Sequence, residues 1–87
     1  MNPEMTEIWS GALFLQQDAL AQAVFDVVCD NLGIAGYGIA RRLDKDPAVI
    51  RGTLSSLVKK KLLWGGSEIG DNFTLTKTGF GVKEAIK

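Results

Sequence analysis

The chain contains no histidine and a single cysteine, Cys29, and these shortages restrict its chemistry. Without histidine it lacks the commonest general base and a favoured zinc ligand. One cysteine cannot form a disulfide within the chain, and it falls in the apolar run Val27-Val28-Cys29. We therefore interpret Cys29 as a buried core residue rather than a reactive thiol, and we expect neither a metal site nor a cofactor.

Long apolar runs are also lacking. No apolar stretch approaches the roughly 20 residues that cross a bilayer, and residues 1–4 lack the basic start of a secretory signal. We therefore expect no membrane contact and a cytoplasmic location. A length of 87 residues allows one modest hydrophobic core, so we expect one domain over residues 1–87.

Arrangements typical of enzymes are missing as well. A Ser-His-Asp triad requires the histidine that the chain lacks. The Gly65-Gly66 pair is not followed by Gly-Lys-Ser/Thr, so it predicts a turn rather than a phosphate-binding loop. No pair of carboxylates falls in an obviously apolar segment, and we expect that the protein is not an enzyme.

The net charge is zero, but the charges are separated along the sequence. Residues 1–35 carry five acidic residues and no basic one, a net charge of −5. Residues 36–61 carry seven basic and two acidic residues, a net charge of +5, and residues 62–87 carry three of each sign. A basic middle can face a polyanion even where the whole chain is neutral.

The spacing of apolar residues predicts two helices in the first third of the chain. The first covers residues 5–15, and its apolar stripe either packs on its own domain or pairs with a second copy. The second covers residues 16–31 and ends where Asn31 and Gly33 tolerate left-handed backbone. The stripe of the first helix consists of Met5, Ile8, Trp9 and Ala12, and that of the second of Leu20, Ala23, Val24, Val27 and Val28, with Leu32 beyond.

The middle of the chain predicts two further helices joined by a tight turn. An extended connector, residues 33–36, leads into a short helix over residues 37–43. Asp46 is suited to cap the next helix and Pro47 to its first position, so we expect a helix over residues 47–61. The inner positions are Ile39, Ala40 and Leu43 in the short helix, and Ile50, Leu54, Leu57 and Val58 in the longer one.

After residue 61 the pattern changes from helix to strand. Leu62-Leu63-Trp64 predicts a short strand, residues 65–72 a turn-rich loop, and the alternating Phe73-Thr74-Leu75-Thr76 a half-buried strand. Together these segments predict a β-hairpin. A final helix over residues 77–87 would direct inward Phe80, Val82 or Lys83, and Ile86.

Three segments in this order resemble the winged helix-turn-helix family, especially the MarR-like and PadR-like bacterial regulators. Tyr37-Gly38-Ile39-Ala40-Arg41-Arg42-Leu43 resembles the family's first motif helix, and residues 46–57 resemble its recognition helix. Residues 59–63 followed by residues 73–79 resemble the lysine-rich helix end, the wing and the Leu-Thr-x-x-Gly close. The resemblance covers roughly half of the chain, from about Ala35 to Gly79.

The resemblance implies a mainly α-helical fold with a small β-hairpin. In this fold residues 16–79 form a winged helix-turn-helix core, flanked by terminal helices at residues 1–15 and 80–87. The resemblance also implies a sequence-specific DNA-binding transcriptional regulator, which places residues 47–59 in the major groove of double-stranded DNA.

Homodimers are common among small bacterial regulators, which often pair through a terminal helix. The resemblance therefore implies contacts between two copies through Ile8, Trp9 and the C-terminal tail. We interpret both tryptophans, Trp9 and Trp64, as core or dimer contacts rather than as groups that stack on a ligand.

The outward face of the predicted recognition helix is slim and has positive edges. Arg51 can take a guanine edge and Ala48 a thymine methyl, while the two serines of this face can hydrogen-bond bases or phosphates. Gly52 on an exposed helix costs about 1 kcal/mol relative to alanine, which a close approach to a partner would offset. The predicted DNA contacts are Tyr37, Arg41, Arg42, Ala48, Arg51, Gly52, Ser55, Ser56, Lys59 and Lys60.

Departures from the family pattern keep a second hypothesis open. Lys61 stands where the family commonly has a helix-ending glycine, and the expected wing carries Glu68 and Asp71 with no basic residue within residues 65–75. An acidic wing would be repelled by DNA phosphates. Together with the neutral net charge, this favours a winged helix that binds protein, for example a phage- or plasmid-encoded modulator of a host complex.

Overall fold

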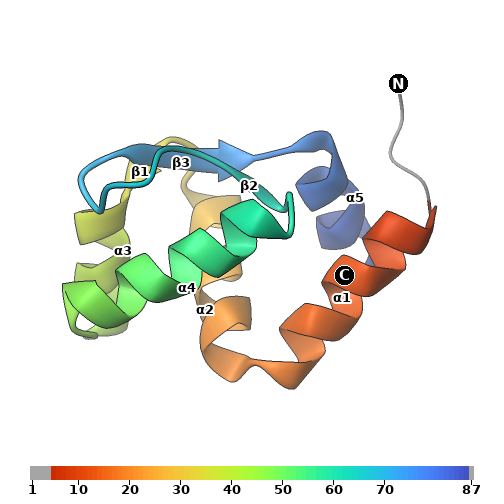
Figure 1. Cartoon of the computed structure of the whole chain (residues 1–87), viewed down its shortest axis with the longest axis horizontal. Coiled ribbons are helices and arrows are strands. Elements are labelled where there is room, and N and C mark those ends of the chain that lie inside the picture. Colours follow the sequence, from red (N-terminus) through yellow and green to blue (C-terminus); the bar gives the residue numbers. More distant parts are fainter. Residues whose placement is uncertain (1–4, 87) are drawn as a thin grey trace.

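The computed structural model describes residues 5–86. Residues 1–4 and Lys87, which belong to the predicted segments 1–15 and 80–87, lie outside the described residues. The elements, shown in Figure 1, are α1 (Met5–Gln17), α2 (Ala19–Asp30), β1 (Ile34–Ala35), α3 (Gly36–Leu43), α4 (Pro47–Lys59), β2 (Leu63–Trp64), β3 (Asn72–Leu75) and α5 (Lys77–Ala85). The prediction of a mainly helical fold with a small β-hairpin is therefore confirmed, although the hairpin belongs to a sheet of three strands.

The sheet has three strands in the order β1-β3-β2, and both neighbouring pairs are antiparallel. Strands β2 and β3 form the expected hairpin, with Leu63 opposite Leu75 and Trp64 opposite Thr74. The segment predicted only as an extended connector supplies β1, whose Ile34 lies opposite Phe73. The sheet thus ties the middle of the chain to its C-terminal third.

Helix α2 begins later than predicted, because the Asp18 carboxylate caps it. The Asp18 side chain accepts a hydrogen bond from the Ala21 amide at 3.0 Å, so the break falls at residue 18 rather than between residues 15 and 16. The prediction for α4 is confirmed, since the Asp46 carboxylate accepts from the Ala48 amide at 2.8 Å. Each carboxylate thereby satisfies an amide that has no partner inside its helix.

Helix α4 ends at Lys59, two residues earlier than predicted. Lys61 itself adopts the left-handed backbone, with φ of 62°, in the turn that follows the helix. The Leu62 amide then donates to the carbonyl of Leu57 at 3.0 Å, which closes the turn. Lys61, where the resemblance in sequence would lead one to expect glycine, therefore adopts a conformation that L-residues adopt at a cost.

The core lies between the helices and the inner face of the sheet. The buried side chains of α4, Ile50, Leu54 and Leu57, were all predicted. Phe25 of α2 is fully buried although it was not placed on the apolar face of that helix, because α2 packs against α3, α4 and β3 and so buries a wider face than one stripe. The largest buried side chains are Phe25, Phe73, Leu15, Ile39, Ile50, Leu54, Leu57, Leu62, Leu63, Val24, Val28 and Val82.

Several side chains predicted to lie inside are exposed. Leu32 follows the end of α2 and Phe80 lies on the outer side of α5. In α1 the inward side consists of Ile8, Ala12 and Leu15, which pack into the core, while Met5 and Trp9 of the predicted stripe are exposed. Cys29 is half-buried against the core rather than fully inside it.

Helix α1 packs chiefly against α5, so the first and last described helices lie side by side, as Figure 1 shows. Ile8 is partly buried and packs against this shared core, while its predicted contact with a second copy stays a prediction. Within residues 5–86 no single helix has the length and hydropathy needed to cross a membrane. Helices α1 and α2 have that length and hydropathy only when taken together, and the pair is bent by 118°.

Candidate nucleic-acid interface

Helix α4 has one anchored side and one open side. Ile50, Leu54 and Leu57 are 0–2% exposed and fix the helix to the core, where it packs against α2 and α3. These positions recur at three- and four-residue spacing, so they lie on one face of the helix. The opposite face of α4 is left to solvent, along the front of the molecule in Figure 1.

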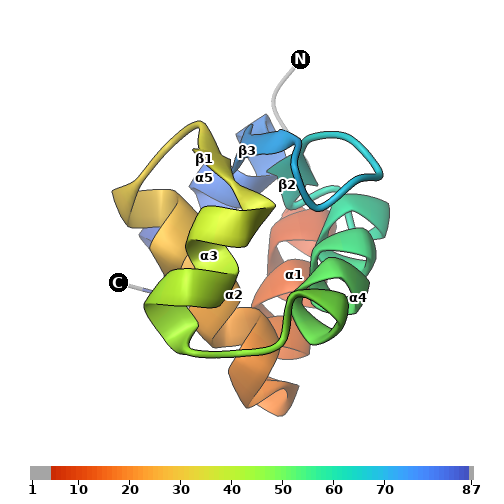
Figure 2. The ribbon, with the colours of Figure 1, turned by 90° about the vertical axis from the view of Figure 1, so that its left-hand side faces the viewer.

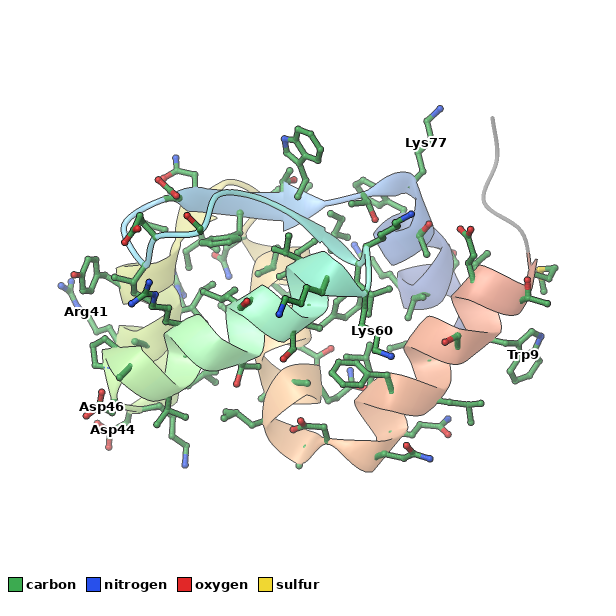
Figure 3. All side chains as sticks on the ribbon, in the orientation of Figure 1. Trp9, Arg41, Asp44, Asp46, Lys60 and Lys77 are labelled. Carbon is green, nitrogen blue, oxygen red and sulfur yellow. The ribbon has the colours of Figure 1, made fainter. Side chains whose placement is uncertain are left out.

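Every side chain predicted to contact DNA is exposed. Arg41 and Arg42 lie in the last turn of α3, and Figure 3 shows Arg41 directed away from the molecule at the end where α4 begins. Tyr37 lies apart from the α4 face, beside Gly70 of the β2–β3 loop. The predicted contacts on α4 and at its C-cap are all exposed, and Val49 of α4 is exposed as well, at 49%; these predicted contacts are Ala48, Arg51, Gly52, Ser55, Ser56, Lys59 and Lys60.

Gly52 lies at the centre of this face in open space. A Cβ placed on Gly52 would meet no atom within 4 Å, so nothing inside the chain requires glycine here. The Ser56 hydroxyl donates to the Gly52 carbonyl at 3.3 Å, which uses its proton within the helix and leaves its oxygen to accept. The middle of α4 therefore presents bare backbone and short side chains to any partner.

Lys59 and Lys60, at the end of α4, point toward different parts of the molecule. The Nζ of Lys60 lies 5.4 Å from the centre of the Phe14 ring, in a cation–π contact with α1. Figure 3 shows Lys60 directed toward α1, and the predicted phosphate contact of Lys60 therefore competes with this interaction. Lys59 is exposed and lies between the groove toward the β2–β3 loop and the groove toward α1, both of which it lines.

A groove of about 300 Å³ separates α4 from the β2–β3 loop. Its floor is apolar and includes Leu54, Val58 and Phe73. Arg51 and Lys59 stand along the helix side of the groove, and Glu68 stands on the loop side. The groove therefore combines an apolar floor with charges of both signs at its rim.

The β2–β3 loop folds back toward the helices, and Figure 2 shows it arching above α4. The Asp71 carboxylate accepts from the Glu68 amide at 3.0 Å, and the Asp71 carbonyl accepts from the Gly36 amide at 3.2 Å. A Cβ on Gly36 would lie 2.3 Å from the Ile69 carbonyl oxygen, so only glycine allows this approach. Asp71, one of the two acidic residues of the loop, therefore uses its carboxylate to stabilise the turn of the loop itself.

Trp64 and Lys77 have positions that the sequence did not indicate. The Trp64 side chain is 72% exposed, so of the two alternatives given for it the core contact is wrong, while the dimer contact stays a prediction. Lys77 begins α5 and lines a second groove together with Trp64 and Lys61. The alternation of the β2–β3 hairpin, in which Leu63 points inward, could have indicated that Trp64 points outward.

Cys29 has the character of a structural thiol. Burial raises the pKa of Cys29 from 9.0 to about 11, and the neighbouring Lys83 only partly opposes this effect. Reactive cysteines have lowered pKa values, because the thiolate is the nucleophile. Among the described residues, no three histidine, cysteine, aspartate or glutamate side chains gather in a group that could hold a metal ion.

Comparison of the chain with models of known protein families gives no match, and a search of curated proteins finds none with significant similarity. The features that bear on function are therefore the exposed α4 face, the basic end of α3 and the grooves beside α4.

Proposed function

We propose that this protein is a winged helix-turn-helix domain that binds double-stranded DNA and regulates transcription without catalysing a reaction. The main support is the exposed α4 face, on which short side chains surround Gly52 while an apolar face holds the helix to the domain. A slim helix of this kind fits the major groove, which admits one α-helix. In the proposal, α3 and α4 are the two motif helices and the β2–β3 hairpin is the wing.

The distribution of charge supports the same function. Arg41 and Arg42 on α3 and Arg51 and Lys59 on α4 are all exposed, so they would be available to phosphates or base edges. The acidic residues of the β2–β3 loop argue against a wing that enters the minor groove. We therefore expect α4 and the end of α3 to supply the affinity, and the loop to contribute little.

Fluorescence polarisation with labelled genomic duplex fragments tests this function at low and moderate salt. Binding should be detectable at low salt and should weaken as salt rises, because phosphate contacts release counterions. Arg51→Ala should weaken binding by about 5- to 100-fold if Arg51 reads a base. Lys59→Ala should weaken all sequences alike and reduce the salt slope by about 1.

Lys83→Ala is the matched control, since it removes the same charge from α5, beside Asp26 and Asp30 of α2 and away from α4. DNA binding should be the same for this variant and the parent chain. Two results would contradict the proposal: no duplex binding even at low salt, or an equal loss in Lys83→Ala and Arg51→Ala, provided that both variants melt cooperatively.

A protein-binding function is the second candidate, and the groove between α4 and the β2–β3 loop favours it. The apolar floor at Leu54 and Phe73 could take an apolar side chain, and Arg51 beside it could pair with an acidic residue of the same partner. Gly52→Trp would then abolish capture of the partner, whereas Gly52→Ala would preserve it. Capture that survives Gly52→Trp would count against this function.

A further inference from the structure

Trp64 is the most exposed large hydrophobic side chain among the described residues, at 72%. It lies on β2, which is an edge strand of the sheet. Its neighbour Leu63 faces the core opposite Leu75, and both leucines are buried. Because successive side chains of a strand point to opposite faces, Trp64 must face outward, and its indole is not needed for the core.

A groove of about 420 Å³ lies beside the Trp64 side chain. Its charged lining residues are Lys61 and Lys77, and its described lining contains no acidic residue. Val58 and Leu63 supply an apolar floor. Lys61 follows α4 and Lys77 begins α5, and Figure 3 shows Lys77 directed away from the ribbon. A flat aromatic surface is therefore combined with two cations.

One threonine joins the two backbone segments that carry Lys61 and Lys77. The Thr76 hydroxyl donates to the carbonyl of Lys61 and accepts from the Gly79 amide at 2.9 Å. It thereby connects the turn after α4 to the first turn of α5. Lys61 also keeps its side chain at a left-handed position, φ 62°, where glycine would fit more easily. A lysine kept at a strained backbone position is consistent with a role for its charge in binding.

We propose that Trp64, Lys61 and Lys77 form a second site, separate from the outer face of α4, that binds an unpaired nucleic-acid strand. One base stacks on the indole of Trp64, and the adjoining phosphates pair with the two lysines. Stacking on an aromatic side chain is available to every base, but only when the base is free of its duplex neighbours. The site therefore selects single strands over duplexes, and its occupancy does not depend on the duplex binding proposed for α4.

Tryptophan fluorescence reports on this site directly. The chain has two tryptophans, so in a Trp9→Phe background all tryptophan emission comes from Trp64. A thymidine oligonucleotide of about 10 nucleotides, within the usual range of single-strand sites, should quench this emission in a saturable way. The same sequence annealed to its complement should give much weaker quenching.

Anisotropy of the labelled oligonucleotide separates the contributions of the three side chains. Trp64→Ala should weaken binding by about 5- to 100-fold through lost stacking. Lys77→Gln and Lys61→Gly should each weaken binding several-fold and flatten its salt dependence. Lys61→Gly is the sharper variant, because glycine suits the left-handed turn and the fold should be retained. Arg51→Ala, which tests α4, should leave single-strand binding unchanged.

Three results would overturn the proposal. The first is equal quenching by single-stranded and duplex DNA. The second is quenching by vesicles of anionic lipid but not by the oligonucleotide, which would assign the exposed indole to a membrane surface. The third is quenching that depends on protein concentration without any nucleic acid, which would assign Trp64 to contact with a second copy. Loss of duplex binding alone would instead refute only the function proposed for α4.

Discussion

Replacement of Gly52 by alanine should stabilise this protein. Gly52 lies within α4, and a Cβ at this position would meet no atom within 4 Å. Alanine is favoured over glycine in an exposed helix by about 0.8–1 kcal/mol, and the open surroundings leave that gain without a steric penalty. For a domain of this size, a gain near 1 kcal/mol raises Tm by roughly 4–8 °C.

Gly11→Ala in α1 is the matched comparison. The gain in helix propensity is the same, but no space is open for the added Cβ. A Cβ at Gly11 would lie 2.7 Å from Leu62 Cδ2 and 2.9 Å from Val82 Cγ2. Both neighbours are fully buried and cannot move into solvent, and overpacking of this kind costs about 1–3 kcal/mol. The propensity gain should therefore be cancelled or exceeded, and Tm should stay the same or fall.

Thermal unfolding followed by circular dichroism measures both variants. A lower Tm for Gly52→Ala, or an equal rise for Gly11→Ala, would refute the argument that tertiary packing decides which glycines are replaceable. Duplex binding by Gly52→Ala then adds a functional readout. If the helix backbone approaches DNA closely at Gly52, the stabilised variant should bind several-fold more weakly.

Three further outcomes are expected. Asp46→Ala should lower stability by about 1 kcal/mol in urea unfolding, because the Ala48 amide loses its cap; an unchanged midpoint would contradict that role. Lys61→Gly should raise stability by roughly 0.5–1 kcal/mol, since φ is 62° there, and a loss would show that the lysine stem packs favourably. Burial raises the pKa of Cys29 to about 11, so its thiol should react slowly with a disulfide reagent at pH 8. The rate should be lower in the folded than in the urea-unfolded chain by on the order of 100-fold. Equal rates would refute the burial of Cys29. Because the unfolded thiol ionises near pH 9.0 and the folded one near pH 11, its contribution to stability is complete below pH 9 and is lost as pH rises toward 11.

The two proposed sites use different physical means to meet a nucleic acid. The α4 face offers short side chains and backbone, which suit insertion between the walls of a groove. The Trp64 site offers an aromatic plane beside two cations, which suits an unstacked base and its phosphates. Variants at Arg51 and at Trp64 therefore separate duplex binding from single-strand binding within one chain.

The positions of the helices could be predicted from local features. The caps at Asp18 and Asp46 need only an amide within the next few residues, although the first of these two was not recognised. The apolar period of α4 predicted its buried residues and its exposed face together. The wrong predictions of burial include Phe25, Phe80 and Trp64, because the burial of a side chain depends on which elements pack around it as well as on the apolar period of its own segment.

Local patterns in the sequence were enough to locate the helices and the hairpin strands and to identify the apolar side of α4, because these properties depend on residues within a few positions of one another. The position of the β2–β3 loop beside α4, and the groove that Lys61 and Lys77 share with Trp64, became visible only in the folded chain. These arrangements join residues that are distant in the chain, and they arise when β3 pairs with both β1 and β2. Strand pairing and core closure are set by packing of the whole chain, which no local pattern specifies.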